Sequence, residues 1–208
     1  MKLAVVTNEV LKKAFLLKQI PAATELVFIN ELNAVPANAD AVFDLLFENN
    51  AERISALQEF LPKPVFINAV SFTLKEINAP FIRLNAWPGF LQRSITEFAV
   101  LPAQQQLAEH IFKQLDWGYQ QVPDTVGMIS ARIVAMIVNE AYFTFDDGVS
   151  TKEEIDIAMK LGTNYPYGPF EWSRMIGLHY IHELLLELSK EDSRYEIAGS
   201  LKAELKNN

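Results

Sequence analysis

The sequence contains no cysteine, which excludes disulfides, thiolate metal sites and cysteine nucleophiles. It also lacks a long hydrophobic run. The apolar stretch at residues 3–6 is too short for a signal peptide, and the densest later one is interrupted by Arg132, Asn139 and Glu140. Since no segment reaches the length of a membrane span, we expect a cytoplasmic protein that does not contact membranes.

Positive charge is scarce, with 18 Lys and Arg residues against 26 Asp and Glu residues and a net charge of -8. This balance argues against nucleic acid as a partner, although a local basic patch for an anionic cofactor stays open. Half of the residues are hydrophobic, which is enough for a sizeable core. The 208 residues allow one domain or two small ones.

The first hundred residues alternate between predicted strands and predicted helices. Short apolar runs predict strands at 3–7, 25–30, 41–47, 64–70, 81–87 and 94–100. Helices are predicted at 10–18, 51–61 and 72–77. This alternation is typical of a compact α/β domain with a parallel sheet and right-handed crossovers.

The pattern becomes helical after a predicted domain boundary near 100–102. Asp124 is predicted to cap a helix that begins near Thr125, and its apolar continuation at 128–145 indicates a buried central helix or a subunit interface.

The next helix is predicted to carry a capping box, with Ser150 at the N-cap and Glu153 at N3, and to end at Gly162. Further helices are predicted at 171–188 and 194–205.

The helical half resembles the C-terminal domain of the 3-hydroxyacyl-CoA dehydrogenases, a family that includes 3-hydroxybutyryl-CoA dehydrogenases. The residues that carry the resemblance are Asp124-Thr125, Gly127, Arg132, Asn139-Glu140-Ala141, Gly148, Glu154-Ile155-Asp156, Ala158 to Gly162, Tyr165-Pro166, Gly168-Pro169-Phe170, Gly177 and Arg194-Tyr195.

The resemblance implies a shortened Rossmann-like parallel sheet domain at 1–101. It further implies a helical C-terminal domain of the 6-phosphogluconate dehydrogenase type at 102–208. Members of the family are NAD-dependent oxidoreductases of fatty acid metabolism, and they usually dimerise through the helical domain. A homodimer and an acyl-CoA-like ligand are therefore the implied partners.

The family's site residues transfer to this sequence only in part. The catalytic His corresponds to Asn85, or to Leu84 in an alternative register, and the orienting Glu corresponds to Glu97. Asparagine does not titrate and cannot serve as a general base. A substrate-binding Ser corresponds to Val70 with Ser71 beside it, and a substrate-binding Asn corresponds to Ala131.

The loop that contains Pro166 and Gly168 either lines a substrate cleft, as in the family, or is a rigid connector. His110, His179 and His182 are predicted to lie on amphipathic helices, and we predict no metal site because no metal-binding motif accompanies them.

The segments expected to bind the cofactor differ most from the family. A dinucleotide fold needs a G-x-G-x-x-G turn after its first strand, but residues 7–12 contain no glycine, and Asn30 replaces the acid expected after the second strand. We therefore predict no cofactor, although the family uses NAD. Two hypotheses remain: a diverged dehydrogenase, or a non-catalytic acyl-CoA-binding or dimeric assembly module. The missing residues favour the second, which would make the chain a pseudoenzyme.

Overall fold

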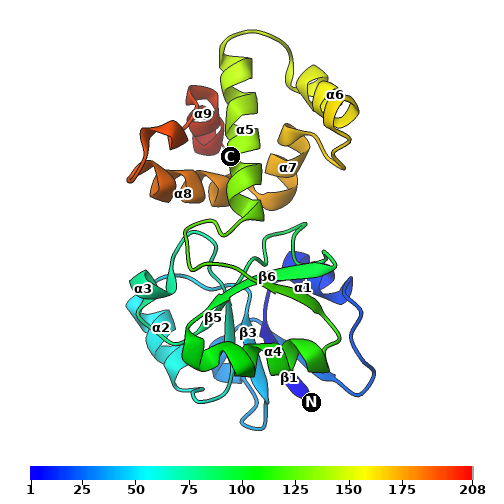
Figure 1. Cartoon of the computed structure of the whole chain (residues 1–208), viewed down its shortest axis with the longest axis vertical. Helices are drawn as coiled ribbons and strands as arrows, with labels where there is room; N and C mark the ends of the chain where they lie inside the picture. Colours follow the sequence, from blue (N-terminus) through cyan, green and yellow to red (C-terminus); the bar gives the residue numbers. More distant parts are fainter. Residues whose placement is uncertain (208) are drawn as a thin grey trace. The chain divides into compact units, whose positions relative to one another are not determined.

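The computed structural model describes residues 1–207 and divides into two compact units, a sheet unit that ends at Met128 and a helical unit that begins at Ile129 (Figure 1). The division falls later than the boundary predicted near 100–102. Residues after 102 still pack on the sheet, because Ala108, Ile111 and Phe112 of helix α4 (Gln105–Gln114) belong to its main hydrophobic core.

The sheet unit is built on one seven-stranded sheet in the order β2-β1-β3-β4-β5-β6-β7. Its strands are β1 Lys2–Val6, β2 Glu25–Ile29, β3 Ala41–Asp44, β4 Val65–Asn68, β5 Ile82–Leu84, β6 Ile95–Val100 and β7 Gly118–Gln121. The pairs are parallel, as predicted, except that β6 runs antiparallel to β5. The connection 85–94 explains this exception, because a parallel crossover needs a dozen or more residues.

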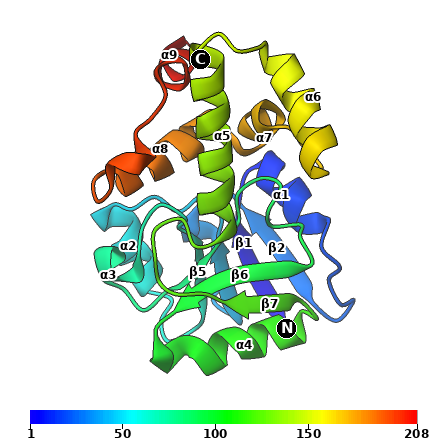
Figure 2. The same ribbon diagram turned by 45° about the horizontal axis from the view of Figure 1, so that its top comes forward.

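Both faces of the sheet are covered, which explains why the strands read as continuous apolar runs. Helix α1 (Glu9–Leu16) contributes Leu11 and Phe15 to the same core as α4. Helices α2 (Ala51–Gln58) and α3 (Leu74–Ile77) contribute Leu57, Leu74 and Ile77 to the second core (Figure 2).

On the β2 side of the sheet, the strand order is that of a dinucleotide-binding fold without its outermost strand. The usual order is 3-2-1-4-5-6, in which a further strand lies outside the second one. In this chain β2 is the last strand on that side, and the short 3-10 turn η1 (Leu32–Ala34) follows it. The shortened sheet predicted from the sequence therefore ends in an edge that the fuller fold would cover.

The helical unit consists of α5 Ser130–Asp146, α6 Lys152–Thr163, α7 Pro169–Ile176, α8 Leu178–Ser189, the 3-10 turn η3 Ser193–Tyr195 and α9 Gly199–Asn207. The buried face of α5 includes Val134, Ala135, Val138 and Tyr142, and α5 packs against α7 and α9. Within residues 1–207 no helix has the length and apolarity required to cross a bilayer.

Several predicted helix ends in this unit are wrong by a few residues. The capping box uses Thr151 and Glu154, one position later than predicted, because Thr151 rather than Ser150 accepts the N–H of residue N3. Helix α6 continues through Gly162 and ends at Asn164, which adopts the left-handed conformation that ends helices.

The helix predicted at 171–188 is two helices. Gly177, with a φ of 102°, interrupts it, because that conformation is incompatible with a continuous helix. The helix predicted at 194–205 is replaced by η3 and α9.

Lys18, two residues after the end of α1, is a buried lysine that contacts a hydroxyl group and an aromatic ring. Its Nζ donates to the Thr96 hydroxyl at 2.8 Å and lies 4.4 Å from the centre of the Trp117 ring. Burial lowers the pKa of Lys18 to about 8, because the charged ammonium loses its hydration.

We expect replacement of Lys18 by Met to flatten the pH dependence of stability. An unfolded lysine has a pKa of about 10.4, so between pH 8 and 10 the unfolded state holds a proton that the folded state has released. The free energy of unfolding should therefore rise with pH in the wild type by roughly 1–3 kcal/mol more than in the variant. Urea denaturation at pH 7, 8, 9 and 10 measures this difference, and parallel curves for the two proteins would contradict it.

Candidate functional site

The carboxyl ends of the parallel strands form the edge at which α/β sheets bind ligands. Asn68, the last residue of β4, joins its neighbours there. Its Nδ2 donates to the Leu45 carbonyl oxygen at 3.3 Å, and its Oδ1 accepts the Ala86 N–H at 3.1 Å. One amide side chain thus ties together the loops that follow β3 and β5.

Asn85 and Glu97, the two predicted catalytic residues, lie opposite each other on this edge. Asn85 follows β5, and its N–H donates to the Glu97 carbonyl oxygen at 3.2 Å. The Asn85 side chain is buried, and its Oδ1 accepts a long hydrogen bond of 3.5 Å from the Trp87 N–H. The backbone pairing of the two positions is present, but the Asn85 amide does not titrate and so cannot serve as the general base.

Ser71, the predicted substrate-binding residue of this unit, is buried in the loop after β4. The Arg83 guanidinium forms hydrogen bonds with the backbone of this loop. Its Nε donates to the Ala69 carbonyl oxygen at 2.8 Å and its Nη2 to the Val70 carbonyl oxygen at 3.2 Å. The shape of the loop that carries Ser71 therefore depends on a charged side chain from β5.

Arg83 is completely buried and forms an ion pair with Asp124. Asp124 also accepts the Leu74 N–H, with its two oxygens at 2.9 and 3.1 Å. The prediction that Asp124 caps the central helix is therefore wrong. Helix α5 begins only at Ser130, and Asp124 instead neutralises Arg83 and binds the start of α3.

The ion pair of Arg83 with Asp124, called the clamp from here on, also holds residues 124–127 at the end of the sheet unit. Arg83 Nη2 donates to the Thr125 carbonyl oxygen at 3.3 Å, and the Gly127 N–H donates to the Val70 carbonyl oxygen at 2.8 Å. The β4 loop and residues 124–127 are thus one hydrogen-bonded cluster.

The turn between β1 and α1 does not fit the pyrophosphate of a dinucleotide. Asn8 Oδ1 accepts the Leu11 N–H at 3.0 Å, so the protein itself uses a donor that a phosphate would need. No residue between 7 and 12 has a positive φ, so the backbone does not adopt a glycine-type turn. Glu9 adds an exposed negative charge in the first turn of α1.

The acid expected after the second strand is also missing, because Asn30 and the neighbouring Glu31 are both exposed there and Glu31 precedes η1. After β3, the buried Asp44 accepts two hydrogen bonds from Arg53, at 2.6 and 2.8 Å. Burial raises the pKa of Asp44, and the Arg53 guanidinium opposes that rise.

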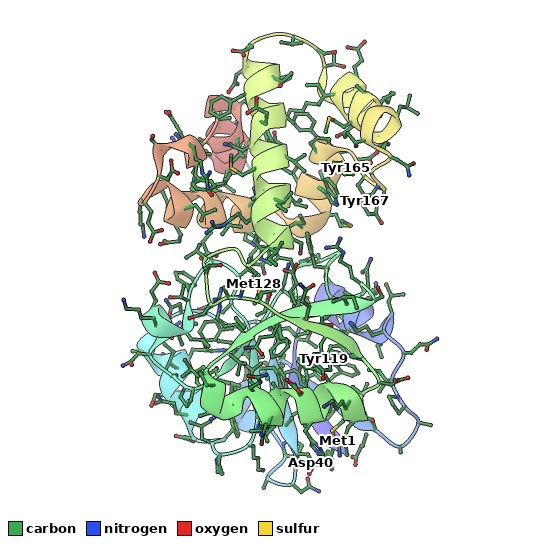
Figure 3. All side chains as sticks on the ribbon, viewed as in Figure 1. Met1, Asp40, Tyr119, Met128, Tyr165 and Tyr167 are labelled. Atoms are coloured by element: carbon green, nitrogen blue, oxygen red, sulfur yellow. The ribbon has the colours of Figure 1, made fainter. Side chains whose placement is uncertain are left out.

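The other predicted site residues lie in the helical unit. Ala131 is buried in the first turn of α5, where its methyl group offers no hydrogen bond to a ligand. Pro166 is exposed in the segment between α6 and α7, as are Tyr167 and, in part, Tyr165 (Figure 3).

Gly168 has a packing role that is visible in the structure. A Cβ atom at this position would lie 2.3–2.5 Å from atoms of Asp156, so only glycine fits. Asp156 Oδ1 accepts the Phe170 N–H at 2.7 Å, and Glu171 accepts the Gly168 N–H at 2.9 Å. These contacts seat the start of α7 on α6 and support the rigid-connector alternative for this loop.

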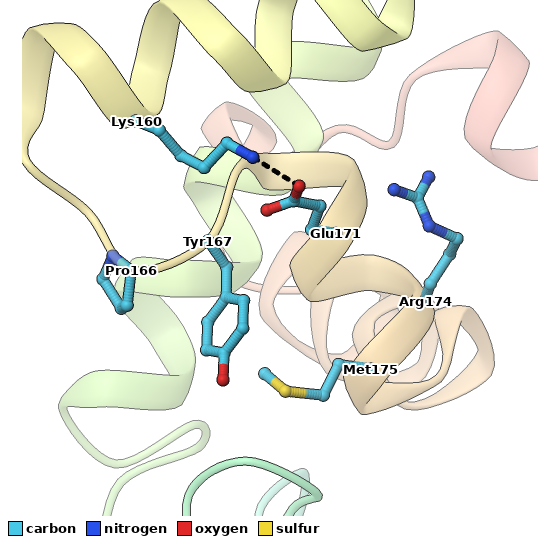
Figure 4. Close-up of a pocket in the computed structure, with 6 residues that line it drawn as sticks. All are labelled: Lys160, Pro166, Tyr167, Glu171, Arg174 and Met175. Atoms are coloured by element: carbon cyan, nitrogen blue, oxygen red, sulfur yellow. Dashed lines mark hydrogen bonds and ion pairs between the residues drawn. The ribbon is translucent and has the colours of Figure 1, made fainter.

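An open pocket of about 600 Å³ lies beside this loop and is lined by Lys160, Pro166, Tyr167, Glu171, Arg174 and Met175. Lys160 and Glu171 form an ion pair at 2.5 Å, with the Tyr167 ring and Met175 below it and Arg174 on the far side of Glu171 (Figure 4). The Lys160 ammonium lowers the pKa of the Glu171 carboxyl. The pocket offers an aromatic ring and two cations, one of them paired within the pocket.

The polar residues Asn139 and Arg132 of α5 contact other residues of the helical unit. Asn139 is buried, and its amide donates to the Glu196 carbonyl oxygen at 2.7 Å and accepts the Ala198 N–H at 3.1 Å. The Arg132 guanidinium lies 5.7 Å from the centre of the Tyr195 ring. Within residues 1–207, no cluster of three or more His, Asp or Glu side chains could hold a metal ion.

The sequence analysis missed Arg83, which organises this edge of the sheet. A signal was present, because Arg83 is the only charged residue in the apolar run 79–86 and a buried charge requires a partner. The partner could not be identified, since Asp124 is 41 residues away in sequence.

The helical unit is similar in sequence to known proteins. Residues 127–206 match the profile of a family described as 3-hydroxyacyl-CoA dehydrogenase, C-terminal domain. The chain is 42% identical over 84 residues to a 3-hydroxyadipyl-CoA dehydrogenase of Escherichia coli, a match that covers 39% of this chain and 18% of the relative. It is 41% identical over 76 residues to a 3-hydroxybutyryl-CoA dehydrogenase of Clostridioides difficile, with coverages of 36% and 27%. The match thus spans about a fifth to a quarter of these relatives.

The fold has a solved counterpart. The (S)-3-hydroxybutyryl-CoA dehydrogenase of Ralstonia eutropha aligns with a TM-score of 0.71 at 23% identity, over 88% of this chain and 70% of that structure. The predicted family resemblance and fold class, a Rossmann-like sheet followed by a helical domain, are thereby confirmed.

The clamp of Arg83 leads to a prediction about stability. We expect Arg83→Leu to lower the free energy of unfolding by about 3–5 kcal/mol, because the ion pair is lost and the carbonyl groups of Ala69, Val70 and Thr125 each lose a donor. Urea denaturation followed by tryptophan fluorescence measures the loss, and hydrogen exchange should show faster exchange at the Gly127 amide.

The matched control is Arg93→Leu. Arg93 is exposed, so its loss should change stability by no more than about 0.5 kcal/mol. Equal effects of the two substitutions would show that the clamp is not a stability determinant.

Proposed function

The helical unit of this chain belongs to the family of 3-hydroxyacyl-CoA dehydrogenase C-terminal domains, and from that premise we propose that the chain is a dehydrogenase-like protein without the usual NAD binding and catalysis. In this proposal it acts as a dimeric module that binds an acyl-CoA-like ligand or assembles with other chains. The observation that carries the proposal is the turn after β1, where Asn8 caps α1 with its own side chain.

The loss of dinucleotide binding follows from that turn. A bound pyrophosphate would have to displace the Asn8 side chain and lie against Glu9, at a turn without the glycines that permit close approach of the backbone. Each of these features disfavours the complex, and Asn30 offers no carboxylate to a ribose.

The loss of the family's proton transfer follows from Asn85. In the family a His takes the hydroxyl proton of the substrate, and the corresponding amide cannot. Glu97 is present one strand away, on β6, where its carbonyl oxygen accepts the Asn85 N–H, but the Asn85 side chain cannot take up a proton.

A homodimer through the helical unit is supported by an apolar surface on α5 and α6. Ile133, Ile157 and Leu161 are exposed by 55%, 53% and 82%. Beside them lies an apolar pocket of about 400 Å³, with Ile137, Val149, Ala158 and Met159 among its lining residues. Exposed apolar surface of this kind is typical of an interface.

A retained acyl-CoA-like ligand is supported by the pocket beside Pro166. An adenine ring could stack on Tyr167, and Arg174 and Lys160 could face phosphate groups. The ion pair of Lys160 with Glu171 weakens the attraction, so the expected affinity is lower than for unpaired cations.

Titration of the purified chain with NADH tests the proposed loss of the cofactor site. We expect no saturable change in NADH fluorescence, whereas a 3-hydroxybutyryl-CoA dehydrogenase measured in parallel should bind. Saturable binding at micromolar concentration would contradict the proposal.

Acetoacetyl-CoA titration of the wild type and of the Glu97→Gln variant provides the companion control. If the proposal holds, the wild type and the variant bind acetoacetyl-CoA with affinities that agree within about threefold. The amide has the shape of the carboxylate, and binding involves no proton transfer to Glu97. A large loss of affinity in the variant would indicate that the family's site still functions.

The dimer is tested by light scattering at micromolar concentration. We expect a particle of at least twice the 23.5 kDa of the chain, and we expect Leu161→Asp to lower its mass because it places a charge on the apolar surface. Leu186→Asp, at an exposed leucine of α8, should leave the mass unchanged. A 23.5 kDa particle for the wild type would contradict the dimer.

A further inference from the structure

Strand β2 ends the sheet on the side where the usual dinucleotide-binding fold carries another strand. We propose that this edge pairs, antiparallel and about a two-fold axis, with β2 of a second copy of this chain. The inference concerns the sheet unit alone and does not depend on the proposed function.

The backbone of β2 has one satisfied side and one open side. On the inner side the Glu25 N–H donates to the Met1 carbonyl oxygen and the Thr7 N–H donates to the Ile29 carbonyl oxygen, both at 2.8 Å. Because successive residues of a strand face opposite sides, the N–H and C=O groups of Leu26 and Phe28 point away from β1. Within residues 1–207 no backbone partner is recorded for these outward groups.

The side chains of β2 suit a covered strand better than an edge. Its sequence, Glu-Leu-Val-Phe-Ile, contains four apolar residues, and each of them is only partly buried. Proteins usually protect an exposed edge with charged side chains, proline or a bulge, and on β2 only Glu25, at its first position, is of this kind. The opposite edge, β7, is Gly-Tyr-Gln-Gln and has the polar character expected of a free edge.

Antiparallel pairing centred on Val27 satisfies every open group. Leu26 then faces Phe28 of the second copy and exchanges both backbone hydrogen bonds with it, and the symmetric pair does the same. Val27 meets its own counterpart across the axis in the closer, non-hydrogen-bonded type of pair. Glu25 faces Ile29 of the second copy, so no like charges are opposed.

A second copy suits this edge because the register opposes only apolar side chains at positions 26 to 28 and keeps the two Glu25 carboxylates apart. Leu26 and Phe28 already pack at the margin of the main core of their own chain. Pairing through β2 brings Leu26 and Phe28 of the two copies together and removes these side chains from water. This is expected for an interface in which both copies contribute the same surface.

A single cysteine tests this register directly, because the chain contains none. In the proposed pair, the Cβ atoms of two opposed residues at position 27 lie about 4.5–5.5 Å apart, close to disulfide geometry. Two residues at position 25 would lie about 13 Å apart, beyond the reach of a disulfide. Glu25→Cys is therefore the matched control on the same strand, and its side chain is the more exposed of the two.

Under mild oxidation, we expect Val27→Cys to form a covalent dimer at least tenfold faster than Glu25→Cys, as seen on a non-reducing gel. Equal rates for the two variants, or cross-linking of Glu25→Cys alone, would overturn the proposal. So would the absence of any cross-link at high protein concentration in a Val27→Cys chain whose circular dichroism matches the wild type.

The same comparison in a Leu161→Asp background separates this edge from the proposed dimer of the helical unit. The preference for position 27 should persist there, whether or not that substitution changes the particle mass. Addition of an extended peptide with the sequence of residues 24–30 should slow the cross-link if the edge is the site of pairing. If position 27 cross-links only when Leu161 is intact, strand pairing is secondary to the helical interface and the proposal fails.

Discussion

The buried guanidinium of Arg83 is the constraint on which the candidate site depends. It is fully enclosed, and its charge is balanced by Asp124, while its remaining N–H groups bind carbonyl oxygens of the β4 loop and of Thr125. A charge in this position can be tolerated only if all of these partners are in place. The loop that carries Ser71 and the segment that leaves the sheet unit are therefore fixed together by one side chain.

Around that constraint the structure keeps the framework of a dehydrogenase and departs from its chemistry. The backbones of Asn85 and Glu97 remain paired, but the first position holds a group that cannot accept a proton. On the same edge of the sheet, after β1, the Asn8 side chain caps the helix terminus that a dinucleotide would use. Both departures lie at strand ends, where side chains can change without disturbing the core.

The sequence was sufficient for features governed by local pattern. Short runs rich in apolar residues located β1 to β6, and matched glycines and prolines located the helical unit. Features that depend on distant partners were not predictable. Asp124 has the local sequence pattern of a helix cap, yet it forms an ion pair with Arg83, which is 41 residues away in sequence. Strand β7 is polar, so its local sequence does not reveal its pairing with β6 or the packing of Tyr119 on Phe98 and Phe112. Gly177 divides a segment whose composition alone favours one helix.

The contact between Gly168 and Asp156 has a consequence for how such chains evolve. Glycine is required there because an added methyl group would collide with Asp156, and Asp156 in turn holds the start of α7. Selection for a folded helical unit would preserve both residues even in a lineage that no longer turned over a substrate. Conservation of Gly168 and Asp156 therefore indicates common ancestry and a preserved fold. Both residues can be retained after the activity of the ancestral enzyme has been lost.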